Sequence, residues 1–217
     1  MTDPLRTQSP LDRLISVADH ALKSAFGCPP ASGRPTPAPH SGATTVLNGA
    51  EKRHAAGLMR VNHAGEIAAQ ALYHGQALVA ADPAVRAFLL SAAREEGDHL
   101  VWCAERLRDL GAKPSVFGPL WYGGSVLIGA MAGLAGDAIS LGFIAETERQ
   151  VEGHIESHLQ NLPAADDASR AVLLQMKSDE AAHRQHALDR GGETLPGPVQ
   201  TLMRGTAKIM TTSAYWL

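Results

Sequence analysis

The 217-residue chain has few cysteines, few aromatic residues and no strong excess of either charge. Its two cysteines, Cys28 and Cys103, are too few for a disulfide framework, so we expect reduced thiols in a cytosol-like compartment. The formal net charge of -3 and the lack of a dense lysine or arginine stripe exclude nucleic acid as a partner. No apolar segment follows a basic start, so we expect no secretory signal.

Alanine, leucine and glutamate are abundant, and these residues favour helices. Helical periodicity runs through most of the sequence, and no convincing strand pattern occurs. Asp82 and Pro83 are typical of a helix start, and Gly111 is typical of a helix end. The expected helices run from Pro10 to about Phe26, about Ala50 to Ala81, Asp82 to Leu110, about Gly136 to Leu162, about Asp166 to Arg190, and Pro198 to the C-terminus. The predicted fold class is all-α.

The longest connection between these helices carries no charge from Val116 to Gly136. Its length alone would permit a transmembrane helix, but Pro119 and several glycines interrupt the apolar run, and Asp137 ends it. A spanning helix would also place the two preceding core helices and the two following ones on opposite sides of the bilayer. We therefore expect this crossover to lie in the membrane interface or to cover an apolar substrate channel.

Two Glu-x-x-His pairs, each preceded by a lone glutamate about 30 residues upstream, form the most informative pattern in the chain. Residues three apart on a helix share a face, so each pair can direct a carboxylate and an imidazole at one point. Two helices that each give a glutamate, with two that each give Glu-x-x-His, is the arrangement of ferritin-like di-metal carboxylate proteins. The candidate metal ligands are Glu66, Glu96, His99, Glu148, Glu180 and His183.

Two tight helical hairpins joined by one long crossover is also the ferritin-like connectivity. We therefore predict a ferritin-like four-helix bundle with a long apolar crossover and extra terminal helices. The expected parts are an N-terminal amphipathic helix (1–26), a Pro-rich linker (27–49) and a di-iron domain with a C-terminal helix (50–217). Because the linker is so rich in proline, glycine and serine, we expect it not to pack and the N-terminal helix to be a tethered appendage.

The charges of the candidate ligands suit a pair of iron ions. Two Fe(II) ions carry four positive charges and four glutamates carry four negative ones, which removes most of the cost of burying the ions. A histidine nitrogen on each metal favours iron over magnesium or calcium. Tetrahedral structural zinc would require more histidine or cysteine ligands, and the two cysteines have no ligand-like partners nearby in the sequence.

Other residues compete with some of these ligands. Glu146 and Glu152 lie on the same predicted helix as Glu148, and Glu152 shares a face with Glu148, so the residues alone leave this choice open. His63 lies one turn before Glu66 and could compete as a ligand, although we expect it behind the ligands or at the surface.

A zinc site is a further alternative at the second pair. His183 and His186 are spaced to bind zinc together, but that interpretation leaves Glu66 and Glu96 without a role.

Polar residues near the ligands are candidates for supporting roles. Glu95, Asp98 and Asp179 lie about 100 degrees off the ligand face, so we expect them to be solvated or to lie behind the ligands. Asp189 is expected to orient a ligand imidazole through a hydrogen bond. His154 is expected to support the ligands or relay a proton, with a solvated position as the alternative.

The sequence resembles the demethoxyubiquinone hydroxylase family of ubiquinone biosynthesis between about Leu58 and Gly192. The matching stretches are RVNHAGE with YHGQ after it, EEGDHL, PLWYGGSVLIGA, ETERQVEGHI and DEAAH. The resemblance supports Glu148 over Glu152, and it implies two iron ions (Fe2+) held by the candidate ligands named above.

The activity that the resemblance implies is that of a di-iron monooxygenase. One oxygen atom of O2 is inserted into the ring of a polyprenylated demethoxyubiquinol, with electrons from NADH, although no Gly-rich dinucleotide fingerprint occurs here. The resemblance also implies a peripheral membrane protein on the cytoplasmic face of the cell membrane. Other proteins of ubiquinone biosynthesis are expected partners.

The chain departs from the family pattern at one position. Some members carry a tyrosine directly after the histidine that corresponds to His154, and this tyrosine is implicated in passing electrons to iron. Here Ile155 takes its place, and an isoleucine can neither relay an electron nor donate a hydrogen bond. The alternative functions are a ferritin-like iron oxidase or storage protein without an organic substrate, and a metal-free helical membrane adaptor.

Overall fold

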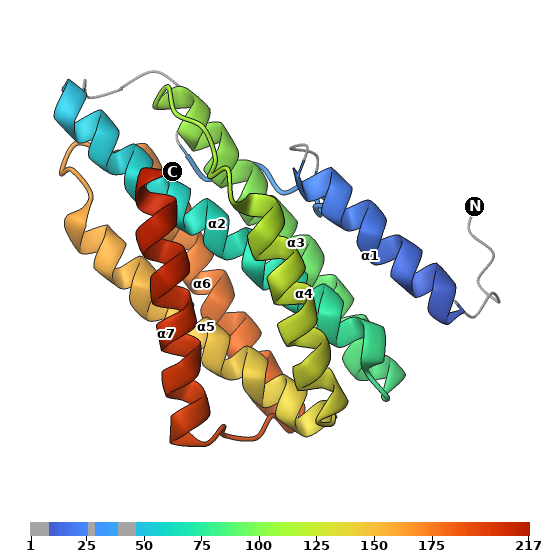
Figure 1. The fold of residues 1–217 in the computed structure, drawn as a ribbon. Coiled ribbons are helices and arrows are strands. Elements are labelled where there is room, and N and C mark those ends of the chain that lie inside the picture. Colours follow the sequence, from blue (N-terminus) through green and yellow to red (C-terminus); the bar gives the residue numbers. More distant parts are fainter. Residues whose placement is uncertain (1–8, 26–28, 39–46) are drawn as a thin grey trace.

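The computed structural model describes residues 9–25, 29–38 and 47–217, and these form seven helices and no strand. The helices are α1 (Pro10–Ala25), α2 (Gly49–Val79), α3 (Pro83–Asp109), α4 (Gly118–Leu134), α5 (Asp137–Asn161), α6 (Asp167–Asp189) and α7 (Gly197–Trp216). The predicted all-α class is therefore confirmed, and the predicted helix ends lie close to the observed ones (Figure 1).

Side chains fix the starts of the core helices. Asn48 accepts hydrogen bonds from the first amides of α2, and the Glu51 carboxylate in turn accepts from the Asn48 amide at 2.8 Å, which completes a capping box. Asp82 caps α3, as predicted, by accepting from the Ala84 amide at 2.7 Å. Gly111 follows α3 with a φ of 72°, a conformation that glycine adopts without strain, so the predicted stop is also confirmed.

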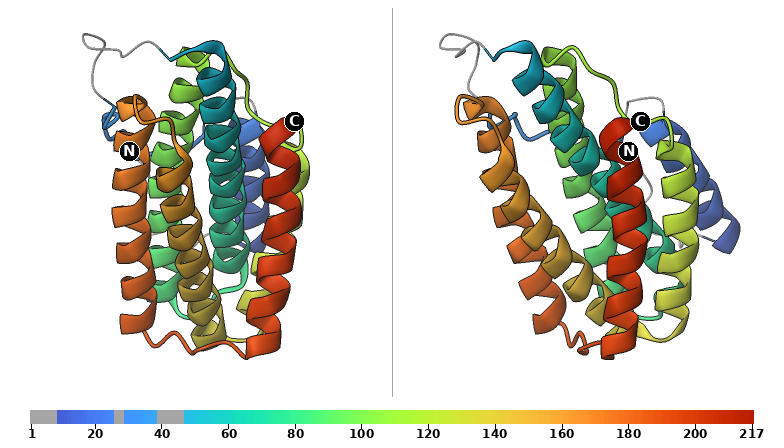
Figure 2. Two further views of the ribbon diagram at one scale, coloured as in Figure 1. Left: turned by 90° about the vertical axis from the view of Figure 1, so that its left-hand side faces the viewer. Right: turned by 60° about the vertical axis from the view of Figure 1, so that its left-hand side comes forward.

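Helices α2 and α3 form one antiparallel hairpin, and α5 and α6 form the other; together they make the four-helix bundle (Figure 2). Apolar side chains fill the bundle in two clusters. One includes Leu107 and Met176, and the other includes Leu89 and Ile144. Along each bundle helix, the candidate metal ligands lie between these two clusters, so the polar residues are enclosed by apolar packing at both ends.

The crossover is a continuous helix, α4, and its glycines do not interrupt it. These glycines instead allow α2 and α4 to approach closely. A Cβ atom at Gly129 would overlap the carbonyl oxygen of Leu72, and one at Gly75 would overlap the carbonyl oxygen of Val126. Among the described residues, no helix combines the length and the apolar character needed to cross a membrane.

Helices α1, α4 and α7 lie outside the bundle, and each of them packs against α2 (Figures 1 and 2). This cover explains why α2 buries residues around most of its circumference rather than along one stripe. At the contact with α1, the rings of His20 and His74 lie 4.4 Å apart.

The expectation that the Pro-rich segment does not pack is wrong for residues 29–38, because this part lies against α3 and is hydrogen-bonded to it. The helix before it is likewise packed on the bundle rather than detached. The boundaries proposed for the parts of the chain stay predictions. Residues 26–28, with Cys28, and residues 39–46 lie outside the described part of the chain.

Candidate metal centre

All the candidate ligands converge at the middle of the bundle, one or two from each of its four helices. They form two groups, and within each group one ligand atom per residue lies within 4.8 Å of all the others. The groups are Glu66, Glu96, His99 and Glu180, and Glu96, Glu148, Glu180 and His183. Every one of these side chains is buried. Glu96 and Glu180 belong to both groups, so each could contribute to two neighbouring metal positions.

The contacts of His99 indicate a place for a cation. Its Nδ1 atom lies 3.3 Å from Glu66 Oε2, 3.0 Å from Glu96 Oε2 and 3.2 Å from Glu180 Oε1. A single ring nitrogen can donate at most one proton, so it cannot satisfy three carboxylates. A metal ion bound by the nitrogen and the surrounding oxygens would satisfy all of them.

Unpaired oxygens support the same conclusion. Glu148 Oε2 is buried without a hydrogen-bond donor among the described residues, and Glu96 Oε1 and Glu180 Oε1 have no aligned donor, although the shared Nδ1 atoms of His183 and His99 lie 3.1 Å and 3.2 Å from them. Buried polar atoms without partners are rare in folded proteins and require an explanation. Oxygen atoms that point at a common centre and lack donors fit metal coordination, so the donor set suits two divalent ions.

The outer nitrogens of the two imidazoles are held by carboxylates from the opposite hairpin. His99 Nε2 on α3 lies 2.9 Å from Asp179 Oδ2 on α6, and His183 Nε2 on α6 lies 3.1 Å from Glu95 Oε2 on α3. If Nε2 carries the proton and donates it to the carboxylate, Nδ1 is left free to bind a metal. Asp179 and Glu95 therefore orient the ligand imidazoles. Each directly precedes a ligand glutamate in the sequence, and this position is the signal that could have identified them.

The partners that the sequence suggested for this role lie elsewhere. Asp189 is exposed and accepts a hydrogen bond from Gln185, so the expectation that it orients an imidazole is wrong. The ring of His154 packs against His158 with 4.3 Å between ring centroids. Within the described residues, no hydrogen bond joins His154 to a candidate ligand.

The residues that the sequence offered as alternative ligands lie outside the two groups. Glu152 pairs with Arg184 at 2.7 Å, and Glu146 pairs with Arg149 at 2.7 Å, which leaves Glu148 as the glutamate of α5 in the cluster. His63 and His186 belong to neither group, and His186 is exposed.

Tyr73 is a functional candidate that the sequence argument did not single out, although it lies in the YHGQ stretch. Its hydroxyl donates a hydrogen bond to Glu148 Oε1 at 2.6 Å, and its ring meets His183 edge-on at 6.1 Å. Burial, reinforced by the charge of Glu148, raises the pKa of the Tyr73 phenol well above its ordinary value. The phenol therefore stays protonated and fixes the Glu148 carboxylate.

Without metal, the carboxylates of the cluster oppose each other. Burial and the neighbouring charge of Glu180 raise the pKa values of Glu66 and Glu148 well above the ordinary value for glutamate. Burial acts on Glu96 in the same direction, but His99 and His183 outweigh it and hold the Glu96 pKa well below its usual range. Two divalent cations would offset the whole set of charges.

Three other histidines are buried mainly in the neutral form. Burial lowers the pKa of His63 to about 4, and it lowers the pKa values of His74 and His158 to about 3. The unfolded chain binds a proton at these positions near pH 6.5. Each of them therefore lowers the free energy of unfolding as the pH falls below about 6.5, until the folded pKa is reached.

We expect His158→Gln to make the protein less sensitive to acid. Between pH 7.5 and 5.5, His158 should account for a loss of about 1.4 kcal/mol in the free energy of unfolding, and the variant should lack this part. Urea unfolding at the two pH values measures the difference, so a constant packing cost cancels. The exposed His186→Gln is the matched control, and it should leave the pH difference as in the wild type. Equal pH differences in the two variants would contradict the prediction.

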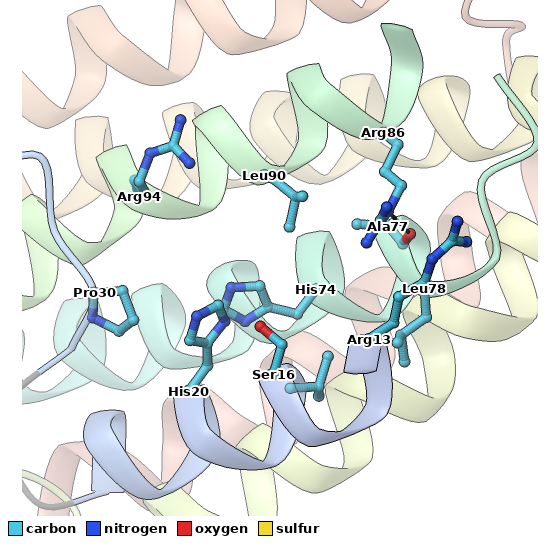
Figure 3. Close-up of a pocket in the computed structure, with 11 residues that line it drawn as sticks. Arg13, Ser16, His20, Pro30, His74, Ala77, Leu78, Arg86, Leu90 and Arg94 are labelled. Carbon is cyan, nitrogen blue, oxygen red and sulfur yellow. Dashed lines mark hydrogen bonds between the residues drawn. The ribbon is translucent and has the colours of Figure 1, made fainter. Parts of the chain in front are cut away.

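A cavity of about 140 Å³ lies between α1, α2 and α3, and it is distinct from the metal centre (Figure 3). Its lining includes Arg13 and His20 of α1, His74 of α2 and Arg94 of α3, and none of the candidate ligands. This cavity therefore gives no direct access to the Glu/His cluster.

Comparisons with known proteins agree with the cluster. The family profile described as "Ubiquinone biosynthesis protein COQ7" matches residues 53–214. A protein of Xanthomonas campestris pv. campestris named 3-demethoxyubiquinol 3-hydroxylase is 54% identical over 212 residues, which cover 98% of this chain and 97% of the relative. Proteins with the same name from Burkholderia multivorans and Cupriavidus necator are each 55% identical, over 95% and 94% of this chain and 99% of each relative.

Proposed function

The chain belongs to the COQ7 family of ubiquinone biosynthesis proteins, and we infer that it is the enzyme that hydroxylates the ring of a demethoxyubiquinol. The observation that carries this function is the buried pair of Glu/His groups at the centre of the bundle. The reaction requires a quinol substrate and O2. A ferritin-like iron store, the alternative considered from the sequence, is not favoured by this family membership.

We propose that Glu66, Glu96, His99, Glu148, Glu180 and His183 hold two iron ions. The four carboxylate charges, the two imidazole nitrogens and the unpaired buried oxygens support this assignment. Iron held there would supply the activation of O2 that insertion of one oxygen atom into the ring requires.

The contribution of the protein is to hold these ligands in one geometry and to exclude water. Asp179 and Glu95 fix the two imidazoles, and Tyr73 fixes the Glu148 carboxylate. Buried apolar side chains such as Leu100 and Ile144 keep bulk water away from the site. A dry site prevents the oxidant from being consumed without hydroxylation.

We propose NADH as the source of electrons and other ubiquinone biosynthesis proteins as partners, as the family resemblance implies.

Ile155 is fully buried and belongs to the apolar core of the bundle, so it has a packing role. Among the described residues, Tyr73 is the phenol that contacts a candidate ligand, Glu148.

We also propose that the protein binds the cytoplasmic face of the cell membrane through α4 and α7. Both helices pack on α2 and expose large apolar side chains on their other faces. The exposed residues are Leu120, Leu127, Met131 and Leu134 on α4, and Leu202, Ile209 and Trp216 on α7. The same surface is suited to the polyprenyl tail of the substrate.

Replacing two apolar residues of this surface with glutamate should weaken the binding of the protein to lipid. Leu127 and Met131 are four residues apart on one face of α4 and are 67% and 63% exposed. Losing two such side chains from the interface removes roughly 3 kcal/mol or more of apolar burial, so Leu127→Glu with Met131→Glu should weaken vesicle binding at least tenfold. The measurement is co-sedimentation with phosphatidylethanolamine and phosphatidylglycerol vesicles.

The matched control adds the same charge on another helix. Ala84 and Ala87 are exposed on α3, and replacing both with glutamate should leave co-sedimentation unchanged. If both double variants lose lipid binding equally, the net charge is responsible and the proposed surface is wrong.

Quinone profiling of a strain that lacks this protein tests the enzymatic function. A demethoxyubiquinone should accumulate in the strain and disappear when the gene is restored. Metal analysis of the purified protein should find two irons per chain. A normal quinone profile, or iron mineralisation without quinol turnover, would refute the proposal.

A further inference from the structure

Residues 29–38, which we call the strap, lie against α3 and reach α6 (Figure 2). The strap lies outside the region matched by the family profile, which begins at residue 53. Its main attachment is the carboxylate of Asp98, a side chain only 1% exposed. Ser32 Oγ donates to it, as do the amides of Gly33 at 2.8 Å and Arg34 at 3.3 Å, and Arg34 Nε at 2.9 Å.

Within the described residues, every hydrogen bond that Asp98 accepts comes from the strap. Without the strap, a carboxylate on α3 would lose all these partners. Gly97, directly before Asp98, makes room for the strap, since a Cβ atom there would overlap the carbonyl oxygen of Pro30. The indole of Trp102 also donates to the Arg34 carbonyl oxygen at 3.2 Å. This part of α3 is therefore shaped to receive the strap.

Arg34 connects the strap to the metal centre. Its Nη1 atom donates to Asp179 Oδ2 at 2.9 Å, and this same oxygen lies 2.9 Å from His99 Nε2. Its Nη2 atom lies 3.4 Å from His99 Nε2. One guanidinium thus holds two acidic side chains, Asp98 and Asp179, and the second of these orients a metal ligand.

The other half of the centre has no counterpart of this arrangement. Glu95, which orients His183, pairs with no lysine or arginine within 4.0 Å among the described residues. The Glu95 side chain is 39% exposed, so water can solvate its charge, whereas Asp179 is only 14% exposed. The two halves of the centre have the same kinds of candidate ligands, but they differ in how the carboxylate behind each histidine is shielded and paired.

From these contacts we propose that the strap closes the His99 side of the metal centre and that Arg34 is a positioning residue for the metal held by Glu66, Glu96, His99 and Glu180. Arg34 acts through Asp179, whose charge it balances and whose carboxylate it aims at His99. The metal held by His183 depends on Glu95 instead, which Arg34 reaches only through its charge and not through a direct ion pair. The two metal positions are therefore inequivalent. This inference rests on the proposed metal site.

The physical basis is the orientation of the imidazole. A carboxylate behind a histidine ligand fixes the ring and makes its free nitrogen a better donor, and its loss costs about 10-fold to 100-fold in metal affinity. Removing the guanidinium leaves Asp179 little exposed and without its cation, with Gln175 as its remaining donor besides His99, so its carboxylate aligns His99 less firmly. The same removal takes away the strap's side-chain bonds from Arg34 to Asp98 and Asp179, which loosens the strap and lets water approach that side.

Anaerobic Fe(II) titration followed by calorimetry tests the proposal, with each metal position isolated. His183→Ala keeps the His99 position, and His99→Ala keeps the His183 position. Arg34→Gln should weaken Fe(II) binding by about 10-fold to 100-fold in the His183→Ala protein and by less than about threefold in the His99→Ala protein. Arg34→Lys keeps the positive charge but loses the planar guanidinium that binds two carboxylates at once, so its loss of affinity should be smaller than that of Arg34→Gln.

Other variants separate positioning from general stability. Asp98→Asn removes the charge that holds the strap but keeps the bond between Arg34 and Asp179, and it should produce a selective loss at the His99 position. Amide hydrogen exchange at residues 29–38 should accelerate in Arg34→Gln and Asp98→Asn. Arg108→Gln, on the exposed face of α3, is the control and should change neither Fe(II) binding nor exchange.

The outcomes distinguish this inference from the function on which it rests. If the wild-type protein binds no Fe(II), the proposed metal site fails, and the positioning role fails with it. If the wild type binds two ions but Arg34→Gln weakens both positions equally, or neither, the positioning role is refuted while the metal site stands. If Arg34→Gln lowers the thermal midpoint but leaves the Fe(II) affinity unchanged, the strap only stabilises the fold and the positioning role is refuted.

Discussion

Replacing Glu180 with alanine is expected to lower the hydroxylation rate by on the order of a thousandfold or more. Loss of a residue that merely supports a metal ligand costs 10-fold to 100-fold, and Glu180 belongs to both ligand groups. The variant should therefore lose both irons rather than one. The measurements are hydroxylation of a demethoxyubiquinol and iron content of the purified protein.

Thermal unfolding gives an independent measurement of the same change. Because Fe(II) binds the folded protein, it should raise the thermal midpoint of the wild type but not that of Glu180→Ala. The matched control is Glu105→Ala on α3, whose side chain is 42% exposed, and it should retain activity, iron and the Fe(II)-dependent shift. A Glu180→Ala protein with full turnover would remove the metal assignment.

The Gly129→Ala substitution should destabilise the protein by about 3 kcal/mol, although alanine is the better helix former. In an exposed helix the same change would stabilise by up to about 1 kcal/mol. At this position the added methyl group overlaps the backbone of Leu72, which no side-chain rotation can relieve, so α4 must move away from α2. The sign of the effect therefore decides between helix propensity and packing.

Gly124→Ala on the same helix is the matched control, because a Cβ atom there has no neighbour within 4 Å. It should be neutral or stabilising by up to about 1 kcal/mol. Urea unfolding of both variants gives the comparison. If Gly129→Ala is as stable as Gly124→Ala, the close approach of α2 and α4 is wrong.

The clustered glutamates and histidines could be predicted from the sequence because they obey a local rule. A Glu-x-x-His pair places both side chains on one face of a helix, and the repetition of the pattern separates it from chance. Helix starts such as Asp82 follow equally local rules. Such features depend only on residues within a turn or two of each other.

The supporting side chains could not be assigned because they depend on contacts between hairpins. Asp179 serves His99, which belongs to another helix far away in the sequence, and Glu95 serves His183 in the same reciprocal way. Sequence spacing favoured Asp189, which lies near a ligand along the chain but is exposed to solvent. Only the register between α3 and α6 decides which carboxylate meets which imidazole.

Glycine and proline were misinterpreted for a related reason. Both residues disfavour regular structure when the chain is considered alone, so no helix was assigned to the crossover and the Pro-rich segment was expected not to pack. In the folded chain, Gly129 permits close helix packing, and the segment around Arg34 binds through hydrogen bonds instead of apolar burial. Composition measures neither kind of contact.

The strap lies between α1 and α2 in the sequence, and these two helices pack on each other and on the rest of the protein. If Arg34 releases its partners, the segment stays part of the same molecule and meets Asp98 again at a high effective concentration. Release and return are therefore events within one molecule, with a rate that does not depend on protein concentration. Metal at the His99 position can then exchange through local opening, while the bundle stays folded.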